Sequence, residues 1–147
     1  MAAAIVACPS CDTKNRVPSV AAGRPRCATC HRDLPWLVDV GDREFDAAVD
    51  VERLVLVDLW AAWCGPCRAV APILATLARD FAGDIKVVKV DVDASPITAR
   101  RYSATSIPTL LFLRHGELVD RLVGAHPEHV LRERVKTLLA GANEPPS

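Results

Sequence analysis

Residues 54–67 read Leu-Val-Leu-Val-Asp-Leu-Trp-Ala-Ala-Trp-Cys-Gly-Pro-Cys, a nearly continuous apolar run that ends in two cysteines. Such a run with a single charged residue is typical of a buried central strand. Beyond the cysteines, apolar side chains recur at positions 70, 73, 74, 77, 78 and 81, which is the spacing of one helix face. The cysteines therefore mark the junction between a buried strand and a long amphipathic helix.

Strands and helices are expected to alternate along the rest of the chain from about residue 37. The pattern predicts a strand over 85–92, a short helix over 98–103, and two strands over 109–113 and 118–123 joined by a tight turn. A last helix is expected to begin at Pro127 and to close at Gly141. This order predicts an α/β fold, with a mostly parallel sheet covered by helices on both faces and a hairpin that adds antiparallel strands.

Composition narrows the class of protein. Half of the 147 residues are hydrophobic, and no apolar run reaches the roughly 18 residues that a membrane-spanning helix needs, so a soluble protein is expected. The formal net charge is zero, although residues 1–34 carry five Lys or Arg against two acids. That excess is too small to favour nucleic-acid binding. A lipoprotein signal before Cys8 is disfavoured because the few preceding residues include no basic side chain, and a cytoplasmic location is expected.

The six cysteines form three Cys-x-x-Cys pairs, a pattern typical of metal sites and redox pairs in a reducing compartment. For Cys64 and Cys67, the strand-to-helix context and the intervening Gly65-Pro66 turn favour redox chemistry over metal binding. The positive end of the helix dipole would stabilise a thiolate at Cys64, the attacking species in disulfide exchange. Cys67, one turn into the helix and expected to be more buried, would then resolve a mixed disulfide.

Asp58 is the single acid in the buried run. A buried carboxylate is costly unless it is neutralised or paired, so its pKa should be raised. Perturbed acids often mark functional sites. The alternative is a polar residue that merely specifies the fold, or a strand-end acid that faces water.

Residues 57–67 resemble the active-site segment of the thioredoxin family, and the resemblance extends over about residues 37–141. It includes Pro72, the Ile107-Pro108-Thr109 segment and Val123-Gly124. It implies a thioredoxin fold, in which helices flank a mixed central sheet, and reduction of protein disulfides by the Cys64/Cys67 dithiol. It also implies that Asp58 accepts the Cys67 proton and that Lys89 lies near this acid, although an exposed strand lysine is an equally good interpretation of Lys89.

The resemblance further implies a cis peptide bond before Pro108 and pairing of the Ile107 backbone with an extended substrate. The implied substrate-binding residues are Trp63, Gly65, Pro66, Ile107, Pro108, Gly124 and Ala125. An NADPH-dependent thioredoxin reductase would regenerate the dithiol. Flavin and nicotinamide would belong to that partner, because this sequence has no Gly-rich dinucleotide fingerprint. Oxidase or isomerase activity is the enzymatic alternative, and a monomer is expected.

The four remaining cysteines are Cys8, Cys11, Cys27 and Cys30. Two Cys-x-x-Cys pairs at this spacing predict one structural zinc ion in a closed shell of four thiolates. The metal would supply folding energy that such a short segment lacks. Iron in place of zinc, or His31 in place of one cysteine, are the alternatives.

The predicted organisation is a four-cysteine zinc ribbon over 1–34, a thioredoxin domain over 35–142 and a disordered tail over 143–147. A zinc ribbon ahead of a thioredoxin domain resembles the bacterial thioredoxin 2 type. The ribbon would recognise partners or sense oxidants. In a further alternative, it is a binding module for which the thioredoxin domain is only a scaffold.

Overall fold

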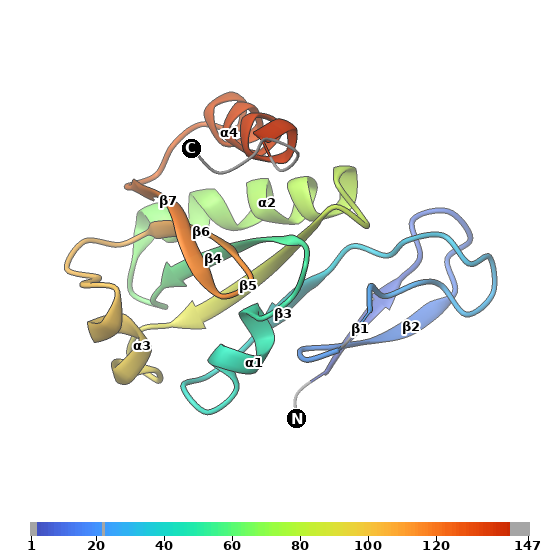
Figure 1. Cartoon of the computed structure of the whole chain (residues 1–147), viewed down its shortest axis with the longest axis horizontal. Helices are drawn as coiled ribbons and strands as arrows, with labels where there is room; N and C mark the ends of the chain where they lie inside the picture. Colours follow the sequence, from blue (N-terminus) through green and yellow to red (C-terminus); the bar gives the residue numbers. More distant parts are fainter. Residues whose placement is uncertain (1–2, 22, 142–147) are drawn as a thin grey trace.

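The computed structural model describes residues 3–21 and 23–141 and contains a five-stranded mixed sheet (Figure 1). The strand order is β3-β5-β4-β6-β7. The first three strands in this order run parallel, and β6 and β7 are antiparallel to their neighbours. The predicted α/β class with a mixed central sheet is therefore confirmed. The bounds are β3 Leu37–Asp39, β4 Leu54–Trp60, β5 Ile85–Asp91, β6 Thr109–Arg114 and β7 Glu117–Val123.

Helices cover both faces of this sheet (Figure 1). One face packs against α2 (Gly65–Asp80) and α4 (Glu128–Gly141), and the other against α1 (Phe45–Val49) and α3 (Pro96–Arg101). Successive residues of a strand point to opposite faces, so β4 contributes Leu56 to the α2 side and Val57 to the α1 side. Asp58 consequently belongs to the α2 side, which also carries the cysteine pair.

Helix boundaries differ slightly from the predicted ones. The short helix begins at Pro96 rather than at residue 98, because proline is well suited to the first helical turn. The final helix begins at Glu128, one residue after Pro127. The tail predicted over 143–147 lies outside the described residues.

The N-terminal segment forms a hairpin of β1 (Ala3–Ala7) and β2 (Lys14–Pro18), which lies beside the main sheet (Figure 1). Its buried side chains do not form a separate core. Val17, Leu34 and Trp36 pack into the same cluster as the α1 face of the sheet, and the Trp36 indole N–H donates to the Pro18 carbonyl at 2.9 Å. This short segment therefore obtains its apolar burial from the main sheet.

Lys86 of β5 joins the hairpin to the sheet, a role that the sequence did not predict. Its side chain is fully buried, and its ammonium donates to the carbonyls of Ser19 and Ala48, each at 2.6 Å. The ammonium also lies 4.2 Å from the centroid of a Trp36 ring. Burial lowers the pKa of Lys86 to about 8.

Among the described residues, no helix is both long enough and apolar enough to cross a membrane.

Candidate active site

Cys64 and Cys67 lie where β4 leads into α2, as the sequence predicts, and they form a disulfide with Cα atoms 5.3 Å apart. Cys64 is the N-cap of α2, and its sulfur accepts the backbone N–H of Cys67 at 3.2 Å. Cys64 is 4% exposed and Cys67 is 3% exposed. Cys67 is expected to be the more buried of the two, but the observed difference is very small. The cap position distinguishes Cys64, because a thiolate there meets unpaired N–H groups and the positive end of the helix dipole.

Trp63 presents the largest exposed apolar surface beside the disulfide, with 68% of its area exposed. Its indole N–H donates to a carboxylate oxygen of Asp93 at 2.8 Å, which restrains the ring. Asp93 is not among the residues that the sequence predicts for the site. The parallel pairing of β4 with β5 would have indicated this contact. Trp60 lies opposite Asp91, so the residues that follow the two strands meet at one edge of the sheet.

The loop before β6 supplies a second wall. Ile107 packs against the cluster that contains Cys64 and Cys67, and the Ile107–Pro108 peptide bond is cis. The Gly124 N–H donates to the Pro108 carbonyl at 2.8 Å. The φ angle of Gly124 is 95°, in a region that favours glycine. Among the other residues predicted to bind substrate, Gly65, Pro66 and Ala125 are exposed.

Asp58 is 1% exposed, and neither of its carboxylate oxygens has a hydrogen-bond partner among the described residues. Burial raises the pKa of Asp58 to about 6, although Lys89 lowers it and Asp39 adds to the increase. Asp58, Lys89 and Asp39 form one cross-strand row over β4, β5 and β3. The Lys89 ammonium lies 5.0 Å from the centroid of a Trp60 ring.

A cavity of about 260 Å³ connects Asp58 with Cys67. Trp60, Lys89 and Arg68 also line it, so the space between the acid and the inner cysteine is partly polar. Most of the lining is apolar, and Asp58, Lys89 and Arg68 supply the polar groups that can hold water there. Asp58 and Cys67 therefore face the same cavity.

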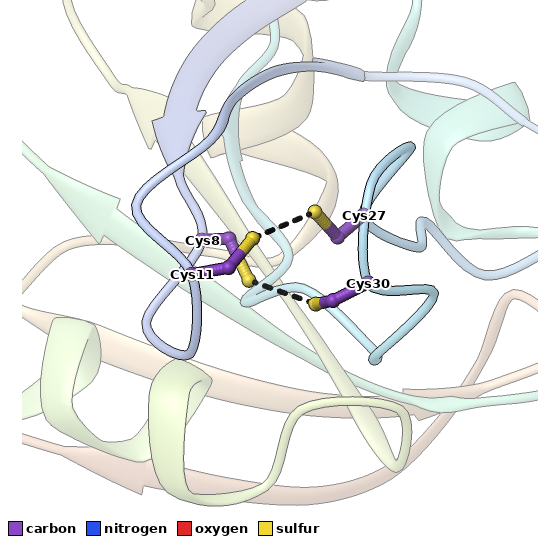
Figure 2. A group of neighbouring side chains, drawn as sticks. All are labelled: Cys8, Cys11, Cys27 and Cys30. Atoms are coloured by element: carbon purple, nitrogen blue, oxygen red, sulfur yellow. Dashed lines mark hydrogen bonds between the residues drawn. The ribbon is translucent and has the colours of Figure 1, made fainter.

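The other four cysteines converge from two loops, one after β1 and one between β2 and β3 (Figure 2). Their sulfur atoms all lie within 4.8 Å of one another. The Cys8 and Cys30 sulfurs are 3.6 Å apart, and those of Cys11 and Cys27 are 3.5 Å apart. The four residues are close enough to hold one metal ion. His31 does not belong to this group within the described residues.

Polar groups lower the pKa of two cysteines of the quartet, Cys8 and Cys27, and so favour their thiolates. The Arg32 backbone lowers the pKa of Cys30, but burial and the neighbouring sulfurs outweigh it and raise that pKa to about 11. The Cys30 backbone N–H is the largest of the influences that lower the pKa of Cys27 to about 5. Asn15 contributes its amide N–H at 3.5 Å from the Cys27 sulfur, and its carbonyl accepts the backbone N–H of Ala28 at 2.9 Å. Metal ligation requires deprotonated cysteine, so these donors suit a metal site.

Comparison with known proteins agrees with this geometry. The family model for thioredoxin matches residues 37–137. The chain is 49% identical over 98 residues to the chloroplastic M-type thioredoxin of Pisum sativum, an alignment that covers 66% of this chain and 57% of the pea protein. It is 45% identical over 97 residues to thioredoxin of Staphylococcus aureus, which covers 66% of this chain and 92% of that protein. The chain belongs to the thioredoxin family, and its Cys64–Cys67 pair makes it a thiol–disulfide oxidoreductase.

Proposed function

We propose that the reduced chain transfers two electrons to disulfides of other proteins through the Cys64/Cys67 dithiol. The observation that carries this proposal is the position of Cys64, whose sulfur caps α2 next to an exposed apolar surface. The Cys64 thiolate attacks one substrate sulfur, forms a mixed disulfide and releases the other substrate sulfur as a thiolate. The Cys67 thiolate then attacks the Cys64 sulfur, releases the second substrate thiolate and forms the Cys64–Cys67 disulfide.

Asp58 serves in this scheme as the proton acceptor for Cys67. Its pKa of about 6 means that it is mostly ionised at neutral pH yet remains a competent base. The cavity between the two residues supports this role. Lys89, which lowers the pKa of Asp58, keeps the acid from becoming too weak to ionise.

Substrate binds, in this proposal, across the surface formed around the disulfide. The exposed indole of Trp63 and the half-buried Ile107 provide apolar contacts, and the Ile107 backbone pairs with an extended substrate segment. Backbone recognition gives affinity without strong sequence preference, which suits an enzyme with many protein substrates. The remaining proposed contacts come from Gly65, Pro66, Pro108, Gly124 and Ala125.

The four N-terminal cysteines are proposed to hold one structural zinc ion. Zinc–sulfur bonds of about 2.3 Å in a tetrahedron separate the sulfurs by about 3.8 Å, close to the 3.5 and 3.6 Å of the two nearest pairs. Zinc would supply folding energy to the segment. It would supply no redox chemistry, because Zn²⁺ has a filled d shell, and four thiolates would leave no open position for a substrate. On this basis we assign residues 1–34 to a zinc ribbon, residues 35–142 to the redox domain, and the chain to the thioredoxin 2 type.

The proposed electron donor is an NADPH-dependent thioredoxin reductase, and the proposed location is the cytoplasm, with the chain acting as a monomer. Support for the cytoplasm comes from the redox pair together with four further free cysteines that lie close enough to hold a metal ion, a combination that persists in a reducing compartment.

Reduction of insulin by dithiothreitol tests the proposal. The chain should accelerate precipitation of the insulin B chain, and Cys64→Ser should abolish the acceleration. Cys67→Ser should instead accumulate a mixed disulfide through Cys64, visible by mass spectrometry. Arg43→Gln, at an exposed position away from the cysteine pair, is the matched control. Equal acceleration by the wild type and Cys64→Ser would contradict the assignment.

A further inference from the structure

A polar cleft of about 520 Å³ lies between the N-terminal segment and the C-terminal end of α2. Arg79 and Asp80 place it at the C-terminal end of α2, whereas Cys64 caps the other end, and a helix of 16 residues is about 24 Å long. The cleft is therefore separate from the active site. The charged residues that line it are mainly arginines: Arg24, Arg26, Arg32 and Arg79, with Asp33 and Asp80.

The two acids of the cleft are already compensated. Arg24 and Arg26 contact the same oxygen of Asp33, at 2.9 and 3.6 Å. Asp80 is paired at 2.7 Å with Arg132, which is not among the residues that line the cleft. Arg24 and Arg26 share the single charge of Asp33, so this group retains one positive charge, and the remaining arginines of the cleft add to it.

Arg32 and Arg79 are those remaining cations. Neither side chain forms an ion pair with any of the described residues, although both are exposed on the cleft. One guanidinium comes from the N-terminal segment and the other from the last turn of α2. A ligand between them would consequently meet positive charge from both sides.

The chemistry of the lining favours a phosphorylated small molecule. Guanidinium groups bind phosphate oxygens in a bidentate manner, and the Ser10 hydroxyl adds a neutral donor. Among the described residues that line the cleft, His31 carries the one aromatic ring and none is Phe, Tyr or Trp, so the surface for nucleobase stacking is small. The apolar lining residues are the small Pro9 and Ala82, which offer little contact area to the side chains of a peptide. The volume lies within the range of small-molecule sites.

The cleft is preformed, because the N-terminal segment contacts the α2–β5 loop very closely. A Cβ atom built on Gly83 would lie 2.5 Å from a carboxylate oxygen of Asp33, and Gly83 has a φ angle of 91°. Only glycine permits this approach without a shift of the backbone or of Asp33. The same carboxylate holds Arg24 and Arg26, so the wall of the cleft is fixed before a ligand arrives.

We propose that this cleft binds a small oligophosphate, held between Arg32 of the N-terminal segment and Arg79 of α2. Such a ligand would link the two parts of the chain. The wall of the cleft includes Pro9, between Cys8 and Cys11, and the two residues that follow Cys30. Binding would therefore also stabilise the loops that carry the cysteine quartet.

Isothermal titration of the full-length metal-loaded protein with inorganic triphosphate tests the proposal. We expect saturable binding of one triphosphate per chain at low salt, and a loss of affinity of about tenfold in Arg79→Gln and again in Arg32→Gln. Arg43→Gln removes an exposed arginine elsewhere and should bind as the wild type does. Insulin reduction should be unchanged in all three variants, because none of these residues touches the redox pair.

Three results would overturn the proposal. The first is no saturable binding at millimolar triphosphate, and the second is an equal loss of affinity in Arg43→Gln, which would indicate nonspecific charge attraction. The third is tighter binding of a glutamate-rich peptide than of triphosphate, which would assign the cleft to acidic protein segments. If Arg32→Gln lowers metal content, Arg79→Gln still provides the test, because Arg79 is exposed on α2 and distant in sequence from the cysteine quartet.

Discussion

Replacing Lys86 with methionine should change how the stability of the whole chain depends on pH. Burial lowers the pKa of Lys86 from 10.5 to about 8. The folded state therefore binds this proton more weakly than the unfolded state does. At about 1.4 kcal/mol per pKa unit, keeping the ammonium charged in the folded state costs about 3 kcal/mol at pH 7.

The cost declines as pH rises, because the folded protein loses the proton near pH 8 while the unfolded chain keeps it. The linkage relation gives a gain of about 2 kcal/mol for the wild type, relative to Lys86→Met, between pH 7 and about pH 9.5. The variant also removes a donor from the Ser19 and Ala48 carbonyls. That effect alters the absolute stability of the variant but varies little with pH.

Urea denaturation followed by circular dichroism, at several pH values, measures this difference. Contributions common to both proteins cancel in the comparison. Lys136→Met, at an exposed position of α4, is the matched control for the loss of a lysine. A constant difference between the wild type and Lys86→Met would refute the assignment of a depressed pKa to this lysine.

Further expectations concern the active site and the cysteine quartet. Asp58→Asn should stabilise the oxidised chain at pH 7 by about 2–3 kcal/mol in urea denaturation, because the raised pKa makes the ionised acid costly above about pH 6. The same variant should slow insulin reduction about tenfold or more. Asp93→Ala should raise the KM for a protein disulfide about fivefold by releasing the Trp63 ring, whereas Asp93→Asn, which retains an acceptor, should not. Asp39→Asn should shift the acidic limb of the pH–rate profile to lower pH, since Asp39 raises the pKa of Asp58. Chelation of the metal should lower the calorimetric Tm of the whole chain, and an unchanged Tm would contradict the proposed structural zinc.

The sequence predicts those parts of the site whose signal is local. Cys64 and Cys67 follow a seven-residue apolar strand and precede an amphipathic helix, so their position at the helix N-terminus can be deduced from neighbouring residues alone. The isolated acid at position 58 is equally conspicuous. The Cys-x-x-Cys spacing likewise indicates that the four N-terminal cysteines converge.

Residues that act through strand pairing or through packing between distant segments could not be deduced in this way. Asp93 reaches Trp63 because β5 pairs in parallel with β4, and Asp39 joins the row of Asp58 because β3 pairs with β5. Lys86 resembles any strand lysine until the hairpin covers it. Its acceptors, the carbonyls of Ser19 and Ala48, are 67 and 38 residues away in sequence.

The position of Trp36 and Lys86 also limits how this architecture can be recombined. A gene fusion that moved residues 1–34 onto another enzyme would leave behind both the indole that donates to Pro18 and the ammonium that donates to Ser19. The recipient scaffold would need an equivalent buried cation and a glycine opposite Asp33. The N-terminal segment therefore cannot be transferred to another protein on its own, because it depends on particular residues just before β3 and within β5 of the main sheet.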